Sequence, residues 1–166
     1  MADHANAGYE RAFGTDDLTF GLGFPLTGSS ETVPDVEAEM ALAAHAEDLG
    51  FDALWARDVP LYWPRFGDAG QSFDVWPWLG HAAAHTDEVA LGTASVVLPL
   101  RHPLHVAKAA ASVDRLSGGR LLLGVATGDR DPEYPAFDVD PGERGARFRE
   151  AVEVLRTVWT GEFPEV

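Results

Sequence analysis

The 166-residue sequence contains no cysteine, which excludes disulfide bonds, thiolate–metal sites and a cysteine nucleophile. Basic residues are also scarce: 27 acidic residues stand against 12 lysines and arginines, and the only lysine is Lys108. The resulting net charge of −15 repels nucleic acid and anionic membranes, so we expect neither as a partner. No apolar run approaches the length of a membrane span, and residues 1–17 lack a signal-peptide core. These absences predict a soluble cytoplasmic protein.

The acidic composition has two interpretations. One is an ordinary acidic enzyme whose charge carries no further meaning. The other, which we favour, is a halophilic protein of a high-salt cytoplasm, where a carboxylate-rich and lysine-poor surface stays hydrated and dissolved ions screen its self-repulsion. Both interpretations concern the solvent and leave the activity open.

The spacing of hydrophobic residues along the chain separates a leader from one domain. Hydrophobic residues make up 46% of the sequence, which is typical of a globular protein, and the length is that of one domain. Residues 1–16 are polar and aperiodic, so we expect a flexible leader there. The regular pattern begins at Asp17, and the predicted domain covers residues 17–166.

Within this domain, four short apolar segments alternate with four amphipathic ones. The apolar segments predict strands at Leu18–Phe24, Phe51–Ala56, Val89–Val97 and Leu121–Val125. Strands that alternate with helices favour a parallel sheet, because each helix carries the chain back to the same end. A whole (βα)8 barrel needs about 250 residues. We therefore predict an α/β fold, a parallel (βα)4 half of a TIM barrel with the C-terminal half absent.

The expected helices have recognisable ends. The first is predicted to begin at a Thr32 cap and to end at Gly50, and the second begins at Asp74. The third begins at Pro103 and carries an apolar stripe that reaches Leu116, and the fourth ends at Gly161.

Half a barrel would leave two strand edges and one sheet face open. Three explanations remain: a truncated product, one half of a split protein completed by another polypeptide, or a half-barrel that pairs with itself. We favour truncation, because residues 162–166 read as an interrupted loop.

Two neighbouring strands finish in small residues. The segment Leu91–Pro103 runs from a strand into a proline-marked helix start, and Arg120–Gly128 repeats this pattern. Small residues at adjacent strand ends leave a flat gap, which in an α/β protein is where a planar cofactor would lie.

These segments resemble the luciferase-like, flavin-dependent monooxygenase family of TIM barrels. The resemblance covers roughly residues 18–163 and rests on three motifs in the family's order: Gly92-Thr93-Ala94 with the following His102-Pro103, the turn at residues 116–121, and the strand at residues 124–128. It implies a non-proline cis peptide bond at Ala94–Ser95, beneath the flavin. The cofactor-binding residues that it implies are Thr93, Ala94, Ser95, Ala126, Thr127 and Gly128.

Other candidate residues have two interpretations each. The resemblance implies an arginine in some relatives at the Thr127 position, on the cofactor phosphate; Arg130 either replaces that charge or is a solvated loop residue. Asp58 follows the second strand and is our candidate catalytic residue, as a hydrogen-bond acceptor or base. Equally, it could pair with Arg57 or cap a turn. His102 is expected to cap a helix, and we predict no metal site.

The resemblance implies a flavin-dependent oxidoreductase or monooxygenase. We expect FMN as cofactor, with reduced flavin and O2 acting on a small organic substrate. One alternative is a deazaflavin, F420, which would imply hydride transfer without oxygen. Another is a non-catalytic fragment or partner subunit. The expected partners are a small-molecule substrate and, where the barrel is split, a complementary half-barrel or a second copy of the chain.

Overall fold

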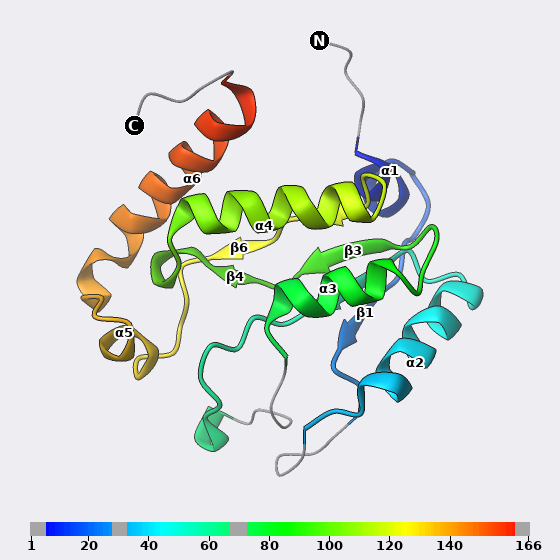
Figure 1. Cartoon of the computed structure of the whole chain (residues 1–166), viewed down its shortest axis with the longest axis horizontal. Coiled ribbons are helices and arrows are strands. Elements are labelled where there is room, and N and C mark those ends of the chain that lie inside the picture. Colours follow the sequence, from blue (N-terminus) through cyan, green and yellow to red (C-terminus); the bar gives the residue numbers. More distant parts are fainter. Residues whose placement is uncertain (1–5, 28–32, 67–72, 162–166) are drawn as a thin grey trace.

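The computed structural model describes residues 6–27, 33–66 and 73–161. Its centre is a parallel sheet in the order β1-β2-β3-β5, with consecutive strands as neighbours (Figure 1). The order is that of four successive βα units, so the predicted α/β half-barrel is confirmed. The strands of this sheet are β1 (Gly21–Phe24), β2 (Ala53–Ala56), β3 (Ala90–Thr93) and β5 (Leu121–Leu122).

The third and fourth predicted strands are each interrupted. Beyond the interruption, β4 (Val96–Val97) pairs in parallel with β6 (Val125–Ala126). At the interruption, Thr93 connects the two strands: its hydroxyl donates to the carbonyl oxygen of Gly124 at 2.7 Å. A Cβ at Gly124 would collide with the Thr93 carbonyl, so the glycine allows this close approach. Sequence periodicity does not register such a break, because the apolar run continues through it.

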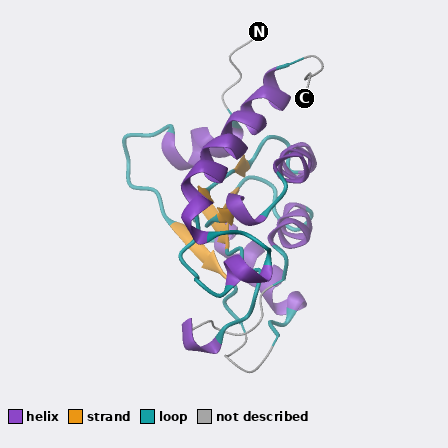
Figure 2. Cartoon of the chain, turned by 90° about the vertical axis from the view of Figure 1, so that its left-hand side faces the viewer, coloured by secondary structure: helices purple, strands orange, loops and turns teal. Residues whose placement is uncertain are grey.

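Helices cover one face of the sheet. Figure 2 shows α3 and α4 nearly end-on beside the strands. The main core lies between these helices and the strands and includes Leu54, Leu79, Leu91 and Val106, each at most 1% exposed. The helices are α1 (Ala7–Phe13), α2 (Val36–Asp48), α3 (Val75–Ala83), α4 (Pro103–Leu116), α5 (Glu133–Ala136) and α6 (Arg144–Thr160), with short 3-10 turns at Pro64–Phe66, Leu98–Leu100 and Pro141–Glu143.

The opposite face of the sheet carries small residues and one large ring. Trp55 of β2 lies against Gly21 and Gly92 of the neighbouring strands, where a Cβ on either glycine would collide with the indole. Helix α1 packs on the same face near the strand starts, with Ala12 against Ala53 and Leu122. Residues 7–13 of the expected leader thus form a docked helix. A seven-residue helix is too short to show a clear apolar period.

Several predicted helix ends are confirmed and two details are wrong. Asp74 and His102 cap α3 and α4 as expected, and Gly50 follows the end of α2 with a φ of 85°. The cap of α2 is Asp35, whose carboxylate accepts from the N–H groups of Glu37 and Ala38, whereas Thr32 lies outside the described residues. Leu116 is 71% exposed, so it does not belong to the buried stripe of α4.

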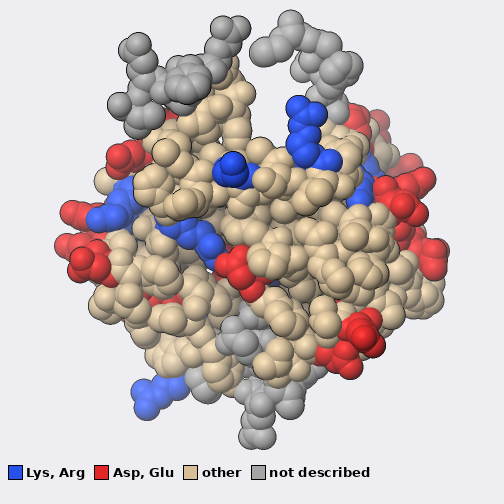
Figure 3. All heavy atoms as spheres, in the orientation of Figure 1, with Lys and Arg blue, Asp and Glu red and all other residues tan. Residues whose placement is uncertain are grey.

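Surface charge follows the acidic composition. In Figure 3 the acidic side chains lie mainly along both sides of the face that carries α3 and α4. Within the described parts of the chain, no helix is both long and apolar enough to cross a membrane.

At the strand starts, a buried arginine joins three segments. Arg120 donates to the carbonyl oxygens of Ser117, Ala83, Thr86 and Val89 at 2.7–3.2 Å, and to the Thr86 hydroxyl at 2.9 Å. Burial lowers the pKa of Arg120, while Glu47 and Asp87 oppose that effect. The guanidinium therefore ties the end of α3 to the starts of β3 and β5.

Replacing this guanidinium should destabilise the whole domain. We expect Arg120→Met to lower the free energy of unfolding by about 3 kcal/mol, because it leaves several buried carbonyl groups without donors. Urea unfolding followed by circular dichroism measures the loss. The control is Arg147→Met, which removes an exposed ion pair with Glu143 and should cost less than about 1 kcal/mol. Equal losses in the two variants would contradict this account of Arg120.

Candidate functional site

A cavity of about 400 Å³ lies at the carboxyl ends of the strands. Its size is within the range of small-molecule sites. Residues from three strand ends and from the loops after β2 and β6 form its lining. Of the seven residues that the sequence predicted for the site, six line this cavity: Asp58, Ala94, Ser95, Ala126, Thr127 and Gly128.

The floor of the cavity is made of small side chains. Ala94 and Ser95 come from the junction of β3 and β4, and the peptide bond between them is cis, as the resemblance implied. Ala126, Thr127 and Gly128 approach from the end of β6. The pairing of β4 with β6 brings these two groups together. A flat ligand can therefore rest on backbone and methyl groups, with the Ser95 and Thr127 hydroxyls beside it.

Thr93 is the predicted cofactor-binding residue that the structure places elsewhere. Its side chain is 1% exposed, its hydroxyl is engaged by the Gly124 carbonyl, and it does not line the cavity. Its role is to join the two interrupted strands beneath the floor. The motif located Thr93 correctly along the strand, but the alternation of side chains across a strand turns it away from the ligand side.

The β6 end is shaped by a glycine and a buried tyrosine. Gly128 has a φ of 88°, and a Cβ on it would lie 2.7 Å from Val97 and 2.9 Å from the Tyr134 hydroxyl. The Tyr134 hydroxyl donates to the carbonyl oxygens of Thr127 and Gly128 at 2.7 and 3.0 Å. Tyr134 thus fixes the backbone of this end. No sequence signal indicated it, because it lies in an acidic, proline-rich loop.

Asp58 lines the cavity but is held by an arginine. Arg101 donates from Nε and Nη2 to the two carboxylate oxygens at 3.0 and 2.6 Å, and the Val97 N–H lies 3.3 Å from Oδ2. Pairing with Arg57 was one of the alternatives for Asp58, and in the structure its carboxylate pairs with Arg101, 43 positions along the chain. A carboxylate whose two oxygens already accept from a guanidinium is poorly placed to take a proton, so the geometry disfavours Asp58 as a base.

Arg130 lies at the rim of the cavity and is 6% exposed. Its guanidinium lies 4.7 Å from the centre of the Phe66 ring and 3.7 Å from the Glu133 carboxylate, and it donates to the Leu61 carbonyl at 3.4 Å. These contacts join the loop after β2 to the loop after β6. The interpretation of Arg130 as a solvated residue is therefore wrong; its proposed contact with a phosphate stays a prediction.

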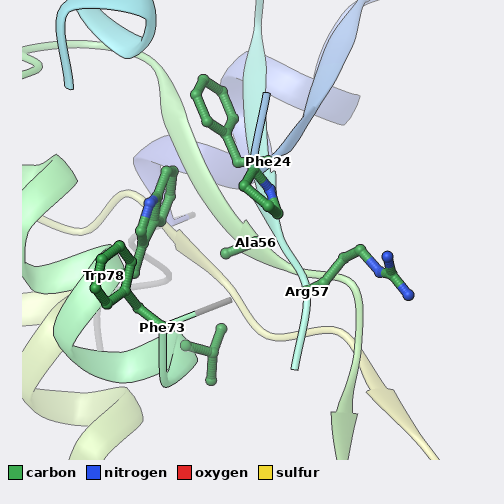
Figure 4. A pocket seen from close by; sticks show the side chains of 7 residues that line it. Phe24, Ala56, Arg57, Phe73 and Trp78 are labelled. Atoms are coloured by element: carbon green, nitrogen blue, oxygen red, sulfur yellow. The ribbon is translucent and has the colours of Figure 1, made fainter. Parts of the chain in front are cut away.

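A second, much smaller cavity lies behind the end of β2. Figure 4 shows Phe24, Phe73 and Trp78 on one side of Ala56, whereas Arg57 extends to the other side. Its volume of about 10 Å³ is at the lower limit for one water molecule, so it is a packing gap. Two of its aromatic side chains belong to the core, where Phe24 and Trp78 have ring centroids 5.0 Å apart.

Two histidines lie side by side on α3. His81 and His85 lie on α3 with ring centroids 4.4 Å apart, and the His85 ring bonds the His81 carbonyl oxygen. Among the residues that the structure describes, no group of three or more potential ligands gathers. The His102 ring accepts from the Leu104 N–H at 3.3 Å, which is the capping role that the sequence predicted.

Removing the Tyr134 hydroxyl should loosen the β6 end. We expect Tyr134→Phe to lower the free energy of unfolding by about 1–2 kcal/mol, since two buried carbonyl groups lose their donor. Burial also raises the pKa of Tyr134 above its ordinary value of 10.0. Its stabilising contribution is complete below that pH and is lost as the pH rises toward the folded-state pKa.

Urea unfolding of the wild type and Tyr134→Phe from pH 7 to pH 11 measures both effects. The stability difference between them should shrink above pH 10. Tyr9→Phe is the control, because Tyr9 is 53% exposed and its loss should change little. A difference that stays constant up to pH 11 would contradict the buried, protonated hydroxyl.

Comparison with known proteins places this site in a family. The family model described as luciferase-like monooxygenase matches residues 17–166. The chain is 40% identical over 126 residues to an F420-dependent glucose-6-phosphate dehydrogenase of Beutenbergia cavernae, covering 74% of this chain and 37% of that protein.

Two solved structures are similar at the level of the fold. One is the monooxygenase RslO1 from Streptomyces bottropensis, with a TM-score of 0.73 and 31% identity, over 87% of this chain and 44% of that one. The other is an F420-dependent secondary alcohol dehydrogenase in complex with an F420–acetone adduct, with a TM-score of 0.72 and 28% identity, over 88% and 43%. The chain therefore spans less than half the length of these relatives. It belongs to the luciferase-like monooxygenase family, a family of oxidoreductases, and forms half of a TIM barrel.

Proposed function

We propose that this chain forms the cofactor-holding half of an F420-dependent oxidoreductase, which moves a hydride between the deazaflavin and a small substrate. The observation that carries the proposal is the cavity over Ala94, Ser95 and the β6 end. Two similar proteins, a sugar-phosphate dehydrogenase and a secondary alcohol dehydrogenase, are both named as F420-dependent. They favour F420 over the FMN that we expected from the sequence.

The residues present fit such a cofactor. A tricyclic ring system needs a flat, narrow slot, and the small side chains of Ala94 and Ala126 leave one. The ring edge needs hydrogen-bond partners, which the Ser95 and Thr127 hydroxyls supply. A cofactor phosphate needs cations, and Arg57 and Arg130 line the same cavity. When bound, F420 supplies a ring carbon that accepts or donates a hydride.

The contribution of the chain is to bind, orient and exclude water. The floor residues hold the ring plane, and the Arg130–Phe66 contact places an aromatic ring at the rim. The Asp58–Arg101 pair keeps its charges engaged with each other. Asp129 also lines the cavity and is exposed.

The substrate class that we propose is a small molecule with a carbon-bound hydroxyl group. Both F420-dependent relatives are named as dehydrogenases of such compounds. We also propose that the remaining barrel strands, on the same or another polypeptide, complete the substrate side of the cavity, because each of these relatives is more than twice as long as the matched part. A cytoplasmic location is consistent with these activities.

FMN with O2 is the second candidate, and it is favoured by the similarity to the monooxygenase RslO1. The two cofactors share a tricyclic ring and a phosphate, so the same floor fits both. They differ in the ring atom that reacts and in the need for oxygen. A direct comparison of binding separates them.

Titration of the purified chain with F420 and with FMN tests the proposal. We expect saturable quenching of F420 fluorescence at micromolar concentration, in low or in molar salt. Ala126→Trp should weaken binding at least tenfold, because the indole fills the space over the floor. The matched control is Ala41→Trp, at an exposed position on α2, which should bind as the wild type does.

The outcomes separate the candidates. Quenching of FMN without F420 would select the flavin monooxygenase. Binding that is equal in Ala126→Trp and the wild type would place the cofactor outside this cavity. Loss of F420 absorbance on addition of glucose 6-phosphate or 2-propanol would extend the proposal to hydride transfer, with Ala126→Trp as the inactive reference.

A further inference from the structure

Arg101 connects three segments at the carboxyl ends of the strands. It follows the 3-10 turn Leu98–Leu100 and precedes α4. Its guanidinium contacts the Asp58 carboxylate after β2 at 3.0 and 2.6 Å, and the Asp74 carboxylate at the start of α3 at 3.0 Å. Burial lowers the pKa of Arg101, but the two carboxylates outweigh that effect and raise it overall, so the guanidinium stays charged.

The Asp58 side chain depends on this cation. It is 1% exposed, whereas that of Asp74 is 47% exposed. A buried carboxylate without a counter-charge is strongly disfavoured, and the bidentate arginine satisfies both of its oxygens. Asp74 has water available and also caps α3, so it depends on Arg101 much less. The pair that matters for the cavity is therefore Arg101 with Asp58.

The Asp58 carboxylate lies beside β4, where a neighbouring strand would otherwise pair with it. The pairing of β2 with β3 ends at the N–H of Ala94, which donates to the Ala56 carbonyl at 2.8 Å. After the turn at Ala94 and Ser95 the chain leaves β2. The N–H of Val97 in β4 then points at the carboxylate of Asp58, at 3.3 Å. The Asp58 carboxylate thus accepts from the N–H that a backbone carbonyl of β2 would meet if the strand continued.

The placement of β4 decides the shape of the cavity. Val97 pairs with Ala126 of β6, and its side chain meets the space beside Gly128. Ala94 and Ser95 precede β4 directly. A displacement of β4 would therefore move both halves of the cavity floor, Ala94–Ser95 and the end of β6.

We propose that Arg101 is a positioning residue for the cavity: it holds the Asp58 carboxylate as a surrogate strand edge for β4 and thereby sets the floor on which the ligand rests. The structural part of this inference stands on the contacts alone. Its consequence for cofactor binding rests on the proposed function.

Amide hydrogen exchange of the purified chain, read by mass spectrometry, tests the structural part. In Arg101→Gln, we expect exchange of residues 94–100 to rise at least tenfold, while exchange of β1 and α2 stays as in the wild type. The double variant Arg101→Gln/Asp58→Asn should recover most of the protection, because a neutral amide needs no counter-charge and still accepts from the Val97 N–H. Arg101→Lys should recover part of it.

A control on an exposed ion pair makes the result specific to Arg101. Arg147→Gln, which breaks an exposed pair on α6, should leave exchange of residues 94–100 unchanged. Unchanged exchange in Arg101→Gln, or a rise that the Asp58→Asn change does not reverse, would overturn the proposal. Should Arg101→Gln fail to fold, Arg101→Lys and Asp58→Ala, which removes the acceptor of the Val97 N–H, carry the same comparison, and wild-type exchange in both would overturn it.

The same variants are then titrated with F420. Weaker binding in Arg101→Gln that the double variant restores supports the role in the cavity, and wild-type binding in Arg101→Gln would overturn that role. Absence of binding by the wild type would remove the proposed function. The exchange data would then still decide whether Arg101 positions β4, so the two failures are distinguishable.

Discussion

The four parallel strands are paired in one register, with Gly21, Ala53 and Ala90 aligned at their starts. Parallel pairing brings every carboxyl end to the same edge, so the loops that follow the strands converge there. The register also aligns Trp55 with Gly92, and the glycine leaves the space that the indole needs. A shift of one residue would turn Trp55 into the helix layer and remove the cavity floor.

Two arginines stabilise the opposite ends of this sheet by different means. At the strand starts, Arg120 binds backbone carbonyl groups and one hydroxyl, so its charge is shared among dipoles. At the strand ends, Arg101 binds the carboxylates of Asp58 and Asp74, so its charge is met by full opposite charges. The first arrangement holds the scaffold together. The Arg101 arrangement places charged groups beside the cavity, where they form ion pairs with one another.

The cavity lining combines two kinds of residue. Its floor consists of backbone and small side chains from Ala94, Ser95 and the β6 end, which set a plane without selecting ring atoms. The polar and charged groups come from loops, at Arg57, Asp129 and Arg130. The similar proteins include an F420-dependent alcohol dehydrogenase and a monooxygenase, which fits a common floor with different loops.

The sequence alone determined the βα order and the parallel sheet, because hydrophobic period is a local signal. Six of the seven site residues predicted from the sequence and its family resemblance line the cavity. The sequence did not reveal helix α1, the break between β3 and β4, or the burial of Tyr134, since a short helix and an irregular loop leave no period. The partner of Asp58 was also decided by the tertiary structure: Arg57 is adjacent in sequence, but the turn after Leu100 brings Arg101 to the carboxylate. Contacts between distant segments depend on how strands and loops converge in space, which residue order does not state.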